Sequence, residues 1–143
     1  MMTTTLKAAH RKKPRIFVSD TDLPRLTRLA DAIADRSPEI ADELLGELER
    51  AKVVKASSLP DDVVRMGSTV TYLPDDGQPM TIVLVFPADA DIAAGRVSIL
   101  TPIGTALLGL SPGQSMEWAA RDGRRHALTV EAVRNDQPVS IAQ

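Results

Sequence analysis

The sequence predicts an α+β protein in which a short N-terminal antiparallel helical hairpin precedes a mainly antiparallel β-sheet domain with one short helix. Apolar residues recur at helical spacing in two stretches before residue 52, and a Ser37-Pro38 break separates these stretches. Beyond residue 62 the apolar pattern changes to short runs that end in tight turns. Because tight turns join neighbouring strands, most of the sheet is expected to be antiparallel.

The two N-terminal stretches predict helices of similar length. The first, near residues 22–36, follows Ser19-Asp20-Thr21-Asp22, which offers several N-cap side chains, and Pro24 falls in its first turn, where proline is tolerated. The second begins at Pro38, with Ser37 as its N-cap. So short a connection requires antiparallel helices, each about 14 residues or about 21 Å long. Their apolar stripes are Leu23, Leu26, Ala30 and Ile33, and Ile40, Ala41, Leu44, Leu45, Leu48 and Ala51.

The rest of the chain predicts strands and their turns. Residues 52–62 contain Ser57-Ser58-Leu59-Pro60 and are expected to form an extended linker. Asp75-Asp76-Gly77 and Asp122-Gly123 are turn sequences that each join two strands. The predicted strands are 68–73, 80–86, 97–100, 116–119 and 128–133.

Residues 101–114 predict a short helix with both ends specified. Thr101 can cap the free amides, and Pro102 fits the first turn because the N–H that it lacks has no partner there. Gly109 suits a left-handed C-cap, and Ser111-Pro112-Gly113 makes a turn that cannot continue the helix. A helix this short must be held against the sheet by its apolar patch, which consists of Ala106, Leu107 and Leu108.

The composition is that of a soluble domain of modest size. The chain has 143 residues, of which 43% are apolar and 25% charged, and it contains no cysteine, which excludes disulfides and thiolate chemistry. The longest strongly apolar run, residues 82–86, is far too short to cross a bilayer. Residues 1–7 lack the apolar stretch of a secretory signal. We therefore expect a cytoplasmic protein with no membrane contact.

The net charge of −2 conceals an uneven distribution. Residues 1–15 contain five basic side chains and no acidic one, and the other 12 basic residues oppose all 19 acidic ones, so the rest of the chain carries −7. We expect residues 1–14 to form a disordered basic tail, although such a tail could also touch phosphates or an acidic partner. An acidic body argues against direct sequence-specific DNA binding, which depends on phosphate contacts.

Four segments carry a resemblance to a known family. They are 64–72 with Gly67-Ser68-Thr69-Val70, Ala88-Asp89-Ala90-Asp91, 97–100, and Pro102-Ile103-Gly104-Thr105-Ala106-Leu107-Leu108-Gly109. Together they resemble the C-terminal domain of the GreA/GreB transcription elongation factors, and more closely the short-armed Rnk-like members of that family. The resemblance extends over residues 16–133. It implies an FKBP-like fold for residues 56–143, preceded by a short coiled coil in residues 15–55.

In the Gre factors the matching loop meets the rim of the RNA polymerase secondary channel, so the resemblance implies a polymerase contact here. That contact would include Asp91, Thr101, Pro102, Ile103 and Gly104. A rigid apolar turn suits this purpose because docking orders few additional groups. The alternative is that the apolar residues pack beneath the sheet, which is favoured for Leu107 and Leu108. Both interpretations stay open for Pro102 and Ile103.

The turn of the hairpin is a second candidate site and consists of Asp35, Arg36, Ser37, Pro38 and Glu39. In the Gre cleavage factors, acidic residues at the tip of a long coiled coil help hold a catalytic magnesium ion, a task that suits carboxylate ligands. Here the predicted arms are much shorter and the tip sequence does not match. The acidic residues are more simply explained as charges that favour a helix N-terminus. We expect no metal site and no stimulation of transcript cleavage.

No catalytic or cofactor-binding motif is recognisable in the sequence. His126 lies beside a hairpin turn and is better explained as a solvated strand residue than as a general base. An FKBP-like fold does not imply prolyl isomerase activity, and four aromatic residues in the whole chain argue against an aromatic-lined pocket. We therefore expect no enzyme and no cofactor. The basic residues Arg121, Arg124 and Arg125 are most simply explained as solvated charges near a turn.

The leading hypothesis is a monomeric transcription regulator that docks on RNA polymerase and competes with Gre factors without reaching the active centre. The alternative, implied by the Rnk-like resemblance, is an interaction module that regulates nucleoside diphosphate kinase or nucleotide metabolism through another partner. A peptidyl-prolyl isomerase is the third and least supported hypothesis.

Overall fold

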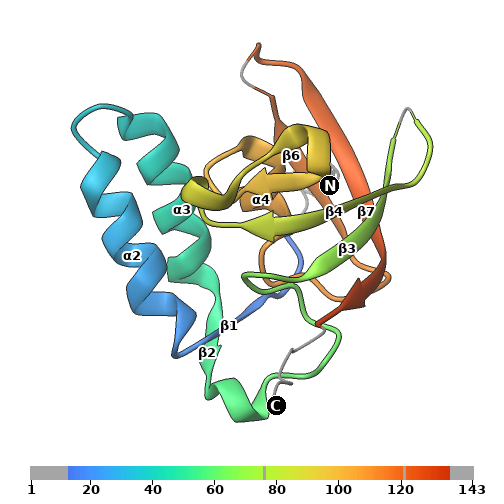
Figure 1. Ribbon diagram of the computed structural model, residues 1–143, viewed down its shortest axis with the longest axis horizontal. Coiled ribbons are helices and arrows are strands. Elements are labelled where there is room, and N and C mark those ends of the chain that lie inside the picture. Colours follow the sequence, from blue (N-terminus) through green and yellow to red (C-terminus); the bar gives the residue numbers. More distant parts are fainter. Residues whose placement is uncertain (1–12, 76, 121, 136–143) are drawn as a thin grey trace, which may run out of the picture.

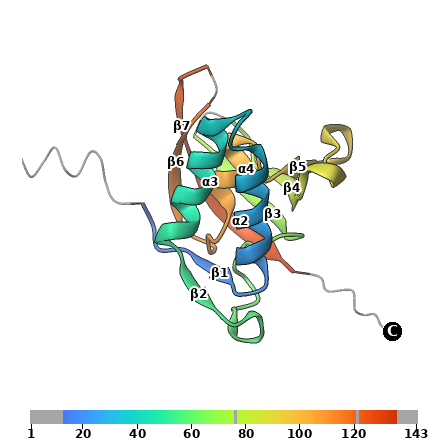
Figure 2. The same ribbon diagram turned by 90° about the vertical axis from the view of Figure 1, so that its left-hand side faces the viewer.

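The computed structural model describes residues 13–75, 77–120 and 122–135, and it confirms the predicted α+β architecture (Figure 1). The helices α2 (Asp22–Ile33) and α3 (Pro38–Arg50) form an antiparallel hairpin beside a five-stranded sheet, and Figure 2 shows both helices in front of that sheet. Within the described residues, no helix has the length and apolar character needed to span a bilayer. Of the tail predicted for residues 1–14, residues 1–12 lie outside the described residues.

The hairpin turns earlier than the sequence predicted. α2 ends at Ile33, and the amides of Arg36 and Ser37 donate to the Ile33 carbonyl at 3.1 and 2.7 Å, which closes a turn through residues 34–36. Pro38 disfavours helical backbone at the residue before it, and Ser37 has a φ of −139°. The predicted capping role of Ser37 is wrong, since its side chain makes no cap hydrogen bond; its carbonyl accepts the Ala41 amide instead.

Two short strands join the segments that enter and leave the hairpin. β1 (Phe17–Ser19) pairs in parallel with β2 (Lys52–Val54), so the beginning of the predicted linker is part of a small sheet. The N-cap of α2 is Thr21, which makes no side-chain cap hydrogen bond, whereas the Ser19 hydroxyl accepts the Asp22 amide at 3.0 Å. The 3-10 turn η1 (Ala56–Ser58) follows β2, where an extended chain was expected.

The main sheet has the strand order β5-β4-β3-β7-β6 and is antiparallel except between β4 and β5. The segment between these two strands contains η2 (Pro87–Asp89) and η3 (Ile92–Ala94) and returns along β4, so that Arg96 pairs with Val83. Ile99 and Leu100 already belong to the turn before the next helix, which makes β5 shorter than predicted. The strands are β3 (Thr69–Pro74), β4 (Met80–Val85), β5 (Arg96–Ser98), β6 (Ser115–Ala119) and β7 (Arg125–Arg134).

The short helix α4 (Pro102–Leu107) has the two ends that the sequence predicted. The Thr101 hydroxyl oxygen accepts the Gly104 amide at 3.0 Å, and Gly109 has a φ of +83°. Leu107 and Leu108 are fully buried, which confirms that they pack beneath the sheet. They belong to one continuous core with residues from both the hairpin and the sheet, among them Leu26, Leu44, Val70, Leu84 and Val130.

Gly109 holds the end of α4 close to the residues that lead into β1, and its replacement tests this contact. A Cβ at residue 109 would lie 2.7 Å from the Ile16 Cβ and 2.9 Å from the Phe17 carbonyl oxygen. We expect Gly109→Ala to lower the free energy of unfolding, measured by urea denaturation, by about 3 kcal/mol, from backbone strain and overpacking together. Gly113→Ala is the matched control, because Gly113 has a φ of +91° but a Cβ added there would have no atom within 4 Å. Equal losses for the two variants would contradict a packing role for Gly109.

Candidate functional site

Residues 101–104 form a corner between β5 and α4. The Thr101 hydroxyl accepts the Gly104 amide at 3.0 Å and donates to the Ser98 carbonyl at 2.8 Å, so one side chain ties both ends of the turn together. Pro102 at the first helical position fixes its own φ. These constraints make the corner rigid, and a partner that docks on it has little to order.

Exposure differs along the corner. Thr101, Pro102 and Ile103 are half-buried, whereas Gly104 is buried. A Cβ at residue 104 would overlap the Ser98 carbonyl oxygen, so Gly104 allows α4 to approach β5 closely and presents no side chain to solvent. Ile103 packs partly against the core and stays partly exposed, so the packing and contact interpretations of this residue are compatible.

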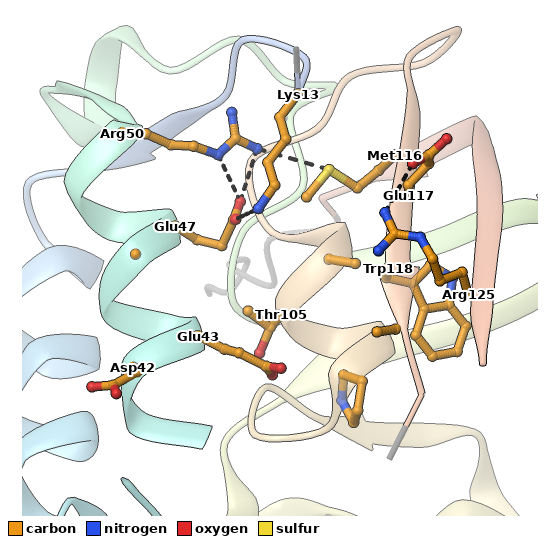
Figure 3. Close-up of a pocket in the computed structure, with 14 residues that line it drawn as sticks. Lys13, Asp42, Glu43, Glu47, Arg50, Thr105, Met116, Glu117, Trp118 and Arg125 are labelled. Carbon is orange, nitrogen blue, oxygen red and sulfur yellow. Dashed lines mark hydrogen bonds and ion pairs between the residues drawn. The ribbon is translucent and has the colours of Figure 1, made fainter. Parts of the chain in front are cut away.

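Two depressions flank the corner. Pro102 lines a groove of about 430 Å³ between α3, α4 and β6 (Figure 3). On the other side, Ile103 lines an apolar hollow, also of about 430 Å³. Trp118 on β6 lines both depressions. The other principal residues of the apolar hollow are Tyr72, Pro79, Met80 and His126.

The apolar hollow gathers two of the four aromatic residues of the chain. The pairing of β6 with β7 sets Trp118 opposite His126, and their rings stack with centroids 5.0 Å apart. The Tyr72 hydroxyl lies 3.6 Å from the Met80 sulfur. Four aromatic residues argue against the aromatic-lined pocket of a prolyl isomerase, but strand pairing brings two of them, distant in sequence, to this one hollow. Counting outward from a two-residue Asp122-Gly123 turn would have set Trp118 opposite Ala127, because the actual pairing of Ala119 with Arg125 shifts the register by one residue.

Asp91 lies at the other end of β5 from the corner. It is exposed, and its backbone exchanges two hydrogen bonds of 2.9 Å with Arg96 at the beginning of that strand. The Asp91 carboxylate also lies 3.7 Å from the Arg96 guanidinium. Because the corner follows the end of β5, the strand separates Asp91 from residues 101–104. Next to Asp91, Ile92 exposes 75% of its surface.

The hairpin tip lies at the end of the helices opposite β1 and β2 (Figure 1). Asp35, Arg36, Pro38 and Glu39 are exposed and Ser37 is half-buried. In the part of the chain that the structure describes, no three acidic or histidine side chains come together in a group able to hold a metal ion.

A buried carboxylate and a cation–π contact fix the beginning of α2 to the sheet domain. Asp22 is only 7% exposed, and its carboxylate accepts the Met66 amide at 3.3 Å. Burial raises the pKa of Asp22 above its usual value, although this hydrogen bond and the charges of Arg25 and Arg65 act in the opposite direction. The Arg25 guanidinium lies 4.4 Å from the centroid of the Phe86 ring.

A second charged cluster holds the end of α3, at the same end of the hairpin as the beginning of α2. Glu47 on α3 is 5% exposed, and both Lys13, at 3.0 Å, and Arg50, at 2.8 Å, form ion pairs with its carboxylate. Arg50 also donates to the Pro14 carbonyl at 2.6 Å. Lys13 and Pro14, which belong to the predicted tail, are therefore attached to the last turns of α3.

Two of the three basic residues near the β6–β7 turn are described, and both are solvated, as the sequence predicted. Arg124 and Arg125 have side chains 77% and 72% exposed, and they lie 3.9 Å from Asp122 and 3.2 Å from Glu117. Arg121 is outside the described residues.

Two family models match consecutive parts of the chain. The Rnk N-terminus matches residues 14–54, and the C-terminal domain of the transcription elongation factors GreA and GreB matches residues 59–135. The matches therefore cover the hairpin with its two short strands, and then the sheet domain.

Individual proteins show the same relationship. The regulator of nucleoside diphosphate kinase from Escherichia coli K12 is 36% identical over 112 residues, which cover 78% of this chain and 82% of that protein. The transcription elongation factor GreA from Rhodospirillum rubrum is 40% identical over 84 residues, which cover 58% of this chain but only 54% of GreA. A solved structure, the prokaryotic transcription elongation factor GreA/GreB from Nitrosomonas europaea, is 34% identical with a TM-score of 0.69, over 85% of this chain and all of that one.

The raised pKa of Asp22 predicts how stability depends on pH. A carboxyl group whose pKa is higher in the folded than in the unfolded state contributes stability at low pH, and this contribution is lost as the pH rises through the folded-state pKa. An asparagine in its place would keep an oxygen for the Met66 amide and carry no charge. We therefore expect Asp22→Asn to gain stability relative to the native chain as the pH rises above about 4, measured by urea denaturation between pH 3.5 and 7. A variant that loses relative stability over this range would show that the charged carboxylate is favoured.

Proposed function

The chain belongs to the GreA/GreB transcription elongation factor family with an Rnk-type N-terminus, and on this premise we propose that it regulates transcription by binding RNA polymerase near the secondary channel. Its C-terminal domain makes the contact through the corner at residues 101–104, and Asp91 forms a separate, peripheral part of the same surface. The hairpin tip, residues 35–39, lies at the mouth of the channel.

The observation that carries this proposal is the corner itself. It lies within the region that matches the GreA/GreB C-terminal domain, and a hydroxyl and a proline hold it rigid. Pro102 and Ile103 are partly exposed between two depressions, so a partner can cover apolar surface on both sides of them. A preorganised apolar contact binds at a lower entropic cost, because docking orders few additional groups.

The length of the hairpin supports regulation by occupancy rather than by transcript cleavage. The helices have 12 and 13 residues, so the arm extends only about 20 Å at 1.5 Å per residue. The chain aligns with little more than half of GreA from Rhodospirillum rubrum. A short arm on the channel rim excludes other Gre-type factors while its acidic residues stay outside the active centre.

A second candidate function rests on the Escherichia coli relative described as a regulator of nucleoside diphosphate kinase. In that case the exposed corner would bind the kinase or another protein of nucleotide metabolism. Size-exclusion chromatography of this protein with purified nucleoside diphosphate kinase, without polymerase, discriminates the two. A stable complex would favour the second function, and separate elution favours an indirect effect.

Substitutions in the corner test the polymerase contact. We expect Pro102→Ala/Ile103→Asp to reduce retention by immobilised core RNA polymerase at least tenfold, since a buried charge replaces an apolar contact worth more than about 1.4 kcal/mol. Val53→Asp is the control, because Val53 is 45% exposed on β2 and lies in the other family match. Thermal melting checks that all three proteins fold. Equal retention of both variants and the native chain would refute the contact.

Competition with a cleavage factor tests the mode of action. We expect the native protein to displace labelled GreA from core polymerase in proportion to its concentration, and to slow GreA-dependent cleavage in backtracked complexes. The protein alone should leave the cleavage rate at its intrinsic value. Acceleration of cleavage by this protein would contradict regulation by occupancy, and the doubly substituted corner variant should neither displace GreA nor slow cleavage.

A further inference from the structure

The groove beside Pro102 has an apolar floor and charged walls. Pro102 and Ala106 of α4 and Met116 and Trp118 of β6 supply the apolar surface. α3 forms the opposite wall, and Figure 3 shows Glu43 pointing from this helix toward α4, whereas Asp42 points away. The groove therefore offers a carboxylate above a surface that can cover the alkyl part of a side chain.

Glu43 differs from the other charged residues that face the groove. Lys13 and Arg50 both pair with Glu47, and Arg125 pairs with Glu117. Among the residues that the structure describes, Glu43 has no hydrogen bond or ion pair. The cations at the Lys13 end of the groove are thus engaged with a buried carboxylate, while the charge available to a ligand at the Pro102 end is negative.

This combination fits one side chain better than others. Arginine has a long apolar stem, a planar guanidinium that lies flat on an aromatic ring, and paired N–H donors that match a carboxylate. Trp118 provides the ring and Glu43 the carboxylate, on opposite walls of the same groove. A lysine ammonium would pair with Glu43 but would not stack as well on Trp118.

We propose that the groove between α3, α4 and β6 binds an arginine side chain of the polymerase surface, with its guanidinium paired to Glu43 and stacked on the Trp118 ring, and its stem against Pro102. The proposal rests on the proposed function and names the chemistry of the partner at that site. The hairpin thereby takes part in docking through α3, in addition to its tip. Complementary charge is the reason for choosing a cationic partner segment.

The basic residues of the chain's own N-terminal segment are the competing occupant. Lys7, Arg11 and Lys12 precede Lys13, which already lines the groove. If these residues covered Glu43, removing its charge would release them and strengthen polymerase binding. The partner arginine predicts the opposite sign, so one substitution discriminates the two occupants.

The test measures the affinity of the full chain for core RNA polymerase by biolayer interferometry at several salt concentrations. We expect Glu43→Gln to weaken binding about tenfold at low salt and to reduce the dependence of affinity on salt, because one charge pair is lost. Glu49→Gln is the matched control, since Glu49 is exposed on the same helix and does not line the groove. It should bind within about twofold of the native chain.

Each outcome has a definite consequence. If Pro102→Ala/Ile103→Asp abolishes binding while Glu43→Gln and Glu49→Gln bind like the native chain, the arginine site is refuted and the proposed function stands. Tighter binding by Glu43→Gln would also refute it and would identify the N-terminal segment as the occupant. A native chain that does not bind polymerase refutes both proposals. Weaker binding by Glu43→Gln with an unchanged salt dependence would refute the charge pair.

Discussion

Leu26 of α2 and Leu44 of α3 are fully buried in the same apolar core as Val70 and Leu84 of the sheet. The hairpin is therefore a layer packed against the sheet, and not an arm that projects freely into solvent. Burial of a leucine side chain contributes about 1.5–3 kcal/mol, so separating the helices from the sheet would cost several such contributions. This shared core fixes the position of the hairpin relative to the corner at residues 101–104.

Charged groups complete this attachment at the edges of the core. Asp22 joins the beginning of α2 to the Met66 amide, and Glu47 holds Lys13 and Arg50 near the end of α3. Both carboxylates are buried, and because desolvation offsets most of the attraction to their partners, such contacts contribute less to stability than to a defined arrangement. Here the arrangement matters, since α3 forms one wall of the groove beside Pro102. The proposed regulation by occupancy requires such a fixed shape.

The position of the corner depends on two close backbone approaches at the ends of α4. Gly104 allows the first turn of the helix to contact the Ser98 carbonyl, and Gly109 allows its end to contact Ile16 and Phe17. Between them the buried leucines hold α4 in the core. Burial begins at Gly104, whereas Pro102 and Ile103 in the first turn of α4 stay half-buried. The features that make the helix stable thus also present the candidate contact.

The sequence by itself determined the elements whose causes are local. Apolar stripes at helical spacing, the Thr101 and Gly109 ends of α4, and the Asp122-Gly123 turn all act within a few residues, and each is found as predicted. The motifs of residues 64–109 likewise indicated the family before any contact was known. Only the tertiary structure decided the parallel pairing of β1 with β2 and of β4 with β5, and the two depressions that meet at Trp118. These depend on which distant surfaces bury each other, and a local pattern does not record that choice.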